Sequence, residues 1–96
     1  EGFALSSRNL LLSNKEINKA RNLTNHIFDF KNKLKNQKNI FKLLQQKKRK
    51  LEKLFDVKVE YLELRKIENL KISSKTQSSK IFIAYFINEV RLIDNI

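Results

Sequence analysis

Hydrophobic residues recur every three or four positions along the first half of the chain, which is the period of an amphipathic helix. Residues 13–34 form one such stripe, and Ser13 and Glu16 have the spacing of a capping box. A second stripe covers residues 39–55, with Asn39 as a possible N-cap. We therefore predict a helical pair over the region 13–55, joined by a short polar connection and packed antiparallel. The stripe residues are Ile17, Ala20, Leu23, Ile27, Phe30 and Leu34, followed by Ile40, Phe41, Leu44, Leu51, Leu54 and Phe55.

The pattern changes to a period of two after Asp56, which is typical of a half-buried strand. Val57, Val59 and Tyr61 alternate with charged residues. The apolar positions then shift by one at residues 62–64, which indicates either a bulge or a second buried face.

Residues 80–87 are apolar with almost no interruption, and this predicts a strand that is buried on both faces and central in its sheet. Asn88 and Glu89 predict a tight hairpin turn, because asparagine tolerates a positive φ. Residues 90–93 then return as the partner strand, whereas the polar residues 73–79 predict a mobile loop. The predicted fold class is α+β, with a small antiparallel sheet of about three strands over 56–96 packed against two helices.

The composition fits one small domain of 96 residues with a modest core, since hydrophobic residues make up 41%. Cysteine is absent from the sequence, which excludes disulfides and thiol catalysis. No apolar stretch approaches the roughly 20 residues that a membrane span needs, and the start lacks the layout of a signal peptide. Methionine is also absent, which fits a fragment of a longer polypeptide.

The formal net charge of +11 raises the possibility of a polyanionic partner. The lysines are scattered over the whole sequence, which is rich in Lys, Asn and Ile, and we favour compositional drift as their origin. Two alternatives therefore stay open on the residues alone. One is a basic nucleic-acid-binding module, and the other is a helical-hairpin interaction protein without a ligand.

The first twelve residues carry the strongest candidate chemistry. Ser6, Ser7 and Arg8 offer several hydrogen-bond donors and one fixed charge, which suits phosphate oxygens. Gly2 is the one glycine in the sequence and would allow a sharp turn just before them.

Other polar residues are weaker candidates. His26 lies in the first predicted helix without converging partners, so we interpret it as an ordinary helix residue. Glu60 and Glu63 are expected on opposite faces of a strand, which makes them a poor acid–base pair. Asp94 is expected to bond backbone amides at a strand end. No metal site is predicted.

Three stretches in the right order carry a resemblance to a known family. Residues 2–9 (Gly-Phe-Ala-Leu-Ser-Ser-Arg-Asn) resemble the Gly-Leu-Ala-Met-Ser-Ser-Arg-Asn loop of pantothenate synthetases, the pantoate–β-alanine ligases. Residues 59–65 (Val-Glu-Tyr-Leu-Glu-Leu-Arg) and 91–96 (Arg-Leu-Ile-Asp-Asn-Ile) are similar to later stretches of the same family. The resemblance corresponds to the family's C-terminal domain.

The resemblance implies an enzyme that condenses pantoate with β-alanine through a pantoyl adenylate, releasing AMP and pyrophosphate. Residues 1–96 would be a C-terminal lid domain, with 1–12 as its ATP-phosphate loop. Leu5, Ser6, Ser7 and Arg8 would bind ATP, with Arg8 as the catalytic group.

The resemblance also implies what this chain lacks. Mg²⁺ would be held mainly by the ATP phosphates and by a missing N-terminal Rossmann-type domain. That domain would supply most of the active site and the contacts of a homodimer, so the chain alone would be inactive. The enzyme would be cytoplasmic, without a membrane or nucleic-acid partner.

Overall fold

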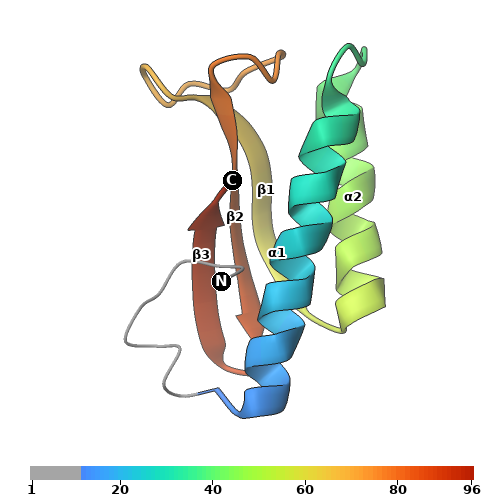
Figure 1. Cartoon of the computed structure of the whole chain (residues 1–96), viewed down its shortest axis with the longest axis vertical. Coiled ribbons are helices and arrows are strands. Elements are labelled where there is room, and N and C mark those ends of the chain that lie inside the picture. Colours follow the sequence, from blue (N-terminus) through green and yellow to red (C-terminus); the bar gives the residue numbers. More distant parts are fainter. Residues whose placement is uncertain (1–11) are drawn as a thin grey trace.

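The computed structural model describes residues 12–96, which form two helices followed by three strands. Both helices lie along the same face of one antiparallel sheet (Figure 1). This is the α+β architecture that the sequence predicts. In chain order the elements are α1 (Asn14–Leu34), α2 (Ile40–Phe55), β1 (Lys58–Lys66), β2 (Ser79–Ile87) and β3 (Val90–Asn95).

Helix α1 begins with the predicted capping box. The Glu16 backbone N–H donates to the Ser13 hydroxyl at 3.2 Å, and the Ser13 N–H donates to the Glu16 carboxylate at 2.9 Å. The bond from the Ser13 backbone, more than any other contact, lowers the pKa of Glu16. The same carboxylate also accepts a hydrogen bond from the side-chain amide of Asn88. The start of α1 is therefore tied to the turn between β2 and β3.

Replacing Ser13 by alanine is expected to lower the free energy of unfolding by about 1 kcal/mol, because the Glu16 N–H loses its acceptor. Ser74→Ala is the matched control, since Ser74 is exposed and lies outside any helix. Urea unfolding of both variants measures the difference. Equal losses in the two variants would show that the cap contributes nothing.

Helix α2 differs from the prediction at its N-terminus. Asn39 is the N-cap residue, but its backbone is left-handed, with φ of 57°, and its side chain makes no capping bond. Its carbonyl still accepts the first helical bond, from the Leu43 N–H at 3.1 Å. The helix ends as predicted near Phe55, where Asp56 is also left-handed and donates its N–H to the Glu52 carbonyl. Asparagine and aspartate are the residues that adopt this conformation most readily after glycine.

The core lies between the helices and the sheet, and α1 supplies it as the periodicity predicts. Leu23 and Ile27 are fully buried there. The predicted apolar face of α2 is too wide, because Phe41 and Leu54 are 67% and 60% exposed. These two residues flank the buried stripe of α2, which consists of Ile40, Leu44 and Leu51.

The strand order is β1-β2-β3, so β2 is the central strand, as predicted. The pairing of β1 with β2 slips by one residue between Val59 and Tyr61, leaving Glu60 as the extra residue of a bulge. The slip returns Leu62 and Leu64 to the face that carries Val59, and all three are buried in the core. The bulge is the physical cause of the phase shift seen in the sequence.

The free edge of β1 is occupied at several points. The Val59 N–H donates to the Glu52 carboxylate at 3.0 Å. Further along, the Ser73 N–H donates to the Leu64 carbonyl at 2.8 Å, and the Lys66 N–H donates to the Lys71 carbonyl at 2.9 Å. These bonds satisfy edge groups that would otherwise face solvent.

The two connections of the sheet follow their local chemistry. Asn88 has a φ of 54°, and Ile87 pairs with Val90 across it, which confirms the predicted hairpin turn. The polar segment 73–79, expected to be mobile, has its two end residues joined by a hydrogen bond of 2.8 Å from the buried Ser79 hydroxyl to that of Ser73.

Candidate functional site

The four candidate ATP-binding residues, Leu5, Ser6, Ser7 and Arg8, lie outside the described residues, and their roles stay predictions. The structure describes the anchor that follows them. Leu12 is 8% exposed and belongs to the core cluster. Since α1 starts next and is bonded to the β2–β3 turn, the candidate loop joins the domain at that end of the sheet.

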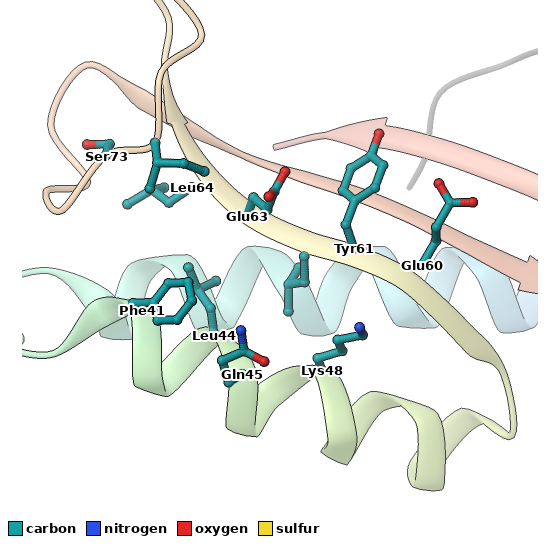
Figure 2. A pocket seen from close by; sticks show the side chains of 11 residues that line it. Phe41, Leu44, Gln45, Lys48, Glu60, Tyr61, Glu63, Leu64 and Ser73 are labelled. Carbon is teal, nitrogen blue, oxygen red and sulfur yellow. The ribbon is translucent and has the colours of Figure 1, made fainter.

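Glu60 and Glu63 lie on the same face of the sheet, so the prediction of opposite faces is wrong. The bulge at Glu60 reverses the alternation of side chains between the two positions. Figure 2 shows Glu60, Tyr61 and Glu63 pointing to one side of β1, away from α2.

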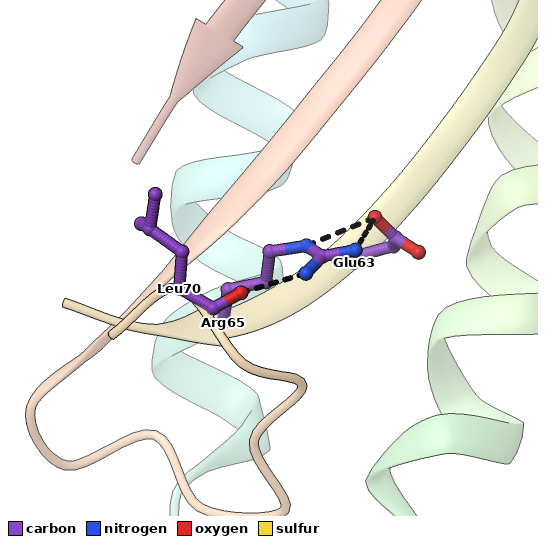
Figure 3. Close-up of polar contacts among 3 residues, drawn as sticks. All are labelled: Glu63, Arg65 and Leu70. Carbon is purple, nitrogen blue, oxygen red and sulfur yellow. Dashed lines mark hydrogen bonds and ion pairs between the residues drawn. The ribbon is translucent and has the colours of Figure 1, made fainter. Parts of the chain in front are cut away.

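Each of these two carboxylates is paired with an arginine. Glu60 accepts two hydrogen bonds from Arg91 of β3, at 2.8 and 3.2 Å, and these bonds lower the pKa of Glu60. Glu63 accepts from Arg65 at 3.0 and 3.2 Å, and the same guanidinium donates to the Leu70 carbonyl at 2.6 Å (Figure 3). Both glutamates are therefore used in structural ion pairs rather than in acid–base chemistry.

The Glu60–Arg91 pair also links two of the three family-like stretches. Glu60 lies in the stretch 59–65 and Arg91 begins the stretch 91–96, and β2 separates their strands in the sheet. Sequence reasoning missed this pairing. The signal that could have found it is simple alternation, because Glu60 follows the core residue Val59 and Arg91 precedes the core residue Leu92, so both point away from the core.

A groove of about 200 Å³ lies between α2 and β1 (Figure 2). Phe41, Leu44 and Lys48 of α2 form one wall, and Tyr61 and Leu62 lie on the other. The volume is below the roughly 300–1,000 Å³ of pockets that enclose drug-sized ligands. The part of the chain that the structure describes also holds no group of three residues suited to a metal ion. The groove is therefore a poor candidate for a nucleotide site.

The helical surface is strongly basic. Between Asp29 and Glu52 the sequence has nine lysines and arginines and no carboxylate. The Lys47 ammonium lies 5.3 Å from the centre of the Phe30 ring. Burial, together with the nearby Lys50 and Lys33, lowers the pKa of Lys47. Lys47 of α2 thus lies over Phe30 of α1, with Lys33 of α1 and Lys50 of α2 nearby.

His26 packs against α2, as expected for a structural helix residue. Its ring meets the Phe55 ring edge to face, with centroids 5.8 Å apart. Burial lowers the pKa of His26 first, followed by the charges of Lys47, Lys33 and Lys50, while Asp29 acts in the opposite direction.

The free energy of unfolding is expected to fall as the pH drops from 7 toward 5. The unfolded chain takes up a proton at His26 near its ordinary pKa of 6.5, whereas the folded chain resists until lower pH. His26→Gln should remove this slope. Urea unfolding at pH 7.5, 6.5 and 5.5 tests it, and His26 is the one histidine in the chain. Parallel pH curves for the two proteins would contradict the prediction.

Comparison with known proteins shows the family of the chain. The sequence model described as pantoate-beta-alanine ligase matches residues 1–96. The chain belongs to this family. Among its relatives, the pantothenate synthetase of Ruthia magnifica subsp. Calyptogena magnifica is 38% identical over 96 residues, which is 99% of this chain and 34% of the relative. The pantothenate synthetase of Thermosipho melanesiensis is 34% identical over 101 residues, covering 100% of this chain and 35% of the relative.

The chain thus spans about a third of the length of these two relatives. Within residues 12–96, neither helix has the length and apolar character needed to cross a membrane. The family match covers the segment of Ser6, Ser7 and Arg8 as well as the whole described fold.

Proposed function

We propose that this chain is the C-terminal domain of a pantothenate synthetase, which condenses pantoate with β-alanine at the expense of ATP. Pantoate and ATP would form a pantoyl adenylate with release of pyrophosphate, and β-alanine would then displace AMP. The observation that carries the proposal is the match of the pantoate–β-alanine ligase family over the entire chain, together with two relatives named pantothenate synthetase.

The domain would act by closing over the ATP phosphates. The Ser6 and Ser7 hydroxyls would donate to phosphate oxygens, and Leu5 would lie beside the adenine. Arg8 would neutralise the charge that builds on the departing pyrophosphate, which stabilises the transition state more than the bound substrate. The anchor at Leu12 and Ser13 supports this role, because it gives the loop a fixed base on the folded domain.

The rest of the ligase would supply the remaining chemistry. Since residues 12–96 offer no cluster of metal ligands, Mg²⁺ would be held by the ATP phosphates and by the nucleotide-binding part of the enzyme. A Rossmann-type domain before Glu1 would bind pantoate and β-alanine and form the contacts of a homodimer. We expect this chain alone to be inactive and the whole enzyme to be cytoplasmic.

The test is exchange of labelled pyrophosphate into ATP by the intact polypeptide that carries this chain. Exchange that requires pantoate is the expected result, because adenylate formation is reversible while β-alanine is absent. Exchange that proceeds equally without pantoate, or with another carboxylic acid in its place, would reject the proposed substrate. Absence of any exchange would reject the proposed chemistry.

A further inference from the structure

Part of the outer edge of β1 carries backbone groups without a partner. Leu64 and Lys66 direct their backbone groups away from β2, since they bond the Ser73 N–H and the Lys71 carbonyl there. Alternate residues of an antiparallel edge strand face the same side, so the N–H and C=O of Leu62 and the N–H of Leu64 also point outward. In the part of the chain that the structure describes, these three groups have no hydrogen-bond partner. They are two free donors and one free acceptor.

These free groups border the groove of about 200 Å³ between α2 and β1, since Leu62 and Leu64 both line it. The apolar part of the groove is open to a ligand, because Phe41 and Ile72, which also line it, are 67% and 52% exposed. Figure 2 shows Phe41 and Lys48 extending from α2 toward β1. The groove thus combines an apolar patch, a strip of unbonded backbone and an ammonium group.

Lys48 gives this groove a positive charge that no carboxylate balances. The two glutamates that also line the groove, Glu60 and Glu63, are each bound to an arginine. Among the described residues, no carboxylate forms an ion pair with Lys48. A carboxylate that enters the groove would therefore meet an ammonium together with backbone donors, and charge-assisted bonds of this kind are strong.

The size and the ends of the groove limit what can enter. A volume of about 200 Å³ is the share of roughly seven water molecules at about 30 Å³ each, which suits a small organic acid. The edge is already bonded on both sides of the free groups, by Glu52 at Val59 and by Ser73 at Leu64. The free stretch is shorter than a peptide strand of about three or more residues. The groove therefore fits a ligand with one N–H and one carboxylate.

We propose that the groove between α2 and β1 binds a small N-acyl amino acid. The carboxylate would accept from the Lys48 ammonium and from a free N–H of the edge, and the amide N–H would donate to the Leu62 carbonyl. The acyl group would lie against Phe41 and Ile72. Pantothenate, in which pantoate is joined to β-alanine by an amide bond, belongs to this class. Its choice as the ligand rests on the proposed function, whereas the class of ligand follows from the groove.

Hydrogen exchange in the intact polypeptide tests the site. Deuterium uptake at the Leu62 and Leu64 amides is followed by mass spectrometry with fragmentation to single residues. The probes are pantothenate and pantothenol, which keeps the amide but has a hydroxyl in place of the carboxylate. Lys48→Ala removes the ammonium of the groove. Lys42→Ala is the matched control, because Lys42 is an exposed lysine of the same helix that does not line the groove.

Saturating pantothenate is expected to slow exchange at one or both amides by at least ~10-fold, because a bonded N–H is protected until the ligand leaves. Lys42→Ala should show the same slowing, whereas pantothenol, or pantothenate with Lys48→Ala, should give much less.

Three outcomes would overturn the proposal. They are no slowing with pantothenate, equal slowing in Lys48→Ala, and full protection of the Leu62 amide before any probe is added, which would mean that another part of the polypeptide fills the groove. Pyrophosphate exchange by the same protein is measured separately. Normal pyrophosphate exchange without amide protection rejects the groove alone, and amide protection without pyrophosphate exchange rejects the proposed function alone.

Discussion

Replacing Arg8 by alanine in the intact polypeptide is expected to slow pantoate-dependent pyrophosphate exchange by ~10-fold or more. A loss of that size corresponds to about 1.4 kcal/mol of activation free energy. The physical reason is that the guanidinium offers a rigid fork of donors and a permanent charge to the phosphate oxygens as pyrophosphate departs. The measurement is the initial rate of label transfer at saturating ATP and pantoate.

Two further variants separate the role of Arg8 from a general loss of positive charge. Arg21→Ala removes an exposed arginine from α1 and should leave the exchange rate unchanged. Arg8→Lys keeps the charge but loses the fork, so it should recover part of the lost rate. If Arg8→Ala exchanges label as fast as Arg21→Ala, the loop has a structural role only.

Leu23→Ala is expected to lower the free energy of unfolding by about 2–5 kcal/mol, the range measured for such truncations in protein cores. Leu23 lies on the core-facing side of α1 and is fully buried. Its truncation removes apolar contacts and leaves a cavity that the helix cannot fill, because its neighbours Ala20 and Ile27 are themselves fully buried. Since small domains have total stabilities of about 5–15 kcal/mol, the variant would lose a large share.

Leu54→Ala makes the same chemical change at a position that is 60% exposed. Its effect should stay within about 0.5 kcal/mol, as for most surface substitutions. Chemical denaturation followed by circular dichroism compares the two variants. A similar loss at both positions would mean that α2 buries Leu54 in solution and that the sequence-based assignment of this residue to the core is correct after all.

Much of the fold could be predicted from the sequence because its signals are local. The capping box needs only Ser13 and Glu16 at the right spacing, and the hairpin turn needs an asparagine that accepts a positive φ. The central position of β2 follows from its nearly continuous apolar run.

The errors arise where the outcome depends on distant parts of the chain. The faces of Glu60 and Glu63 depend on a bulge in the pairing of β1 with β2, which the sequence of β1 signals but does not locate. The exposure of Phe41 and Leu54 depends on how α2 sits against the sheet. The candidate site is a further case, because Ser6, Ser7 and Arg8 lie outside the described residues and were proposed from a resemblance in sequence.

The hydrogen bonds along the outer edge of β1 affect how readily this domain would aggregate at high concentration. An exposed strand edge is a template on which another chain can add a strand, and repeated addition leads to fibres. Here the Glu52 carboxylate accepts a hydrogen bond from the Val59 N–H. Further along the edge, the Ser73 N–H donates to the Leu64 carbonyl, and the Lys66 N–H donates to the Lys71 carbonyl. Recruitment of a neighbouring strand at β1 would first have to break these bonds. The domain thus carries its own protection against polymerisation on that side.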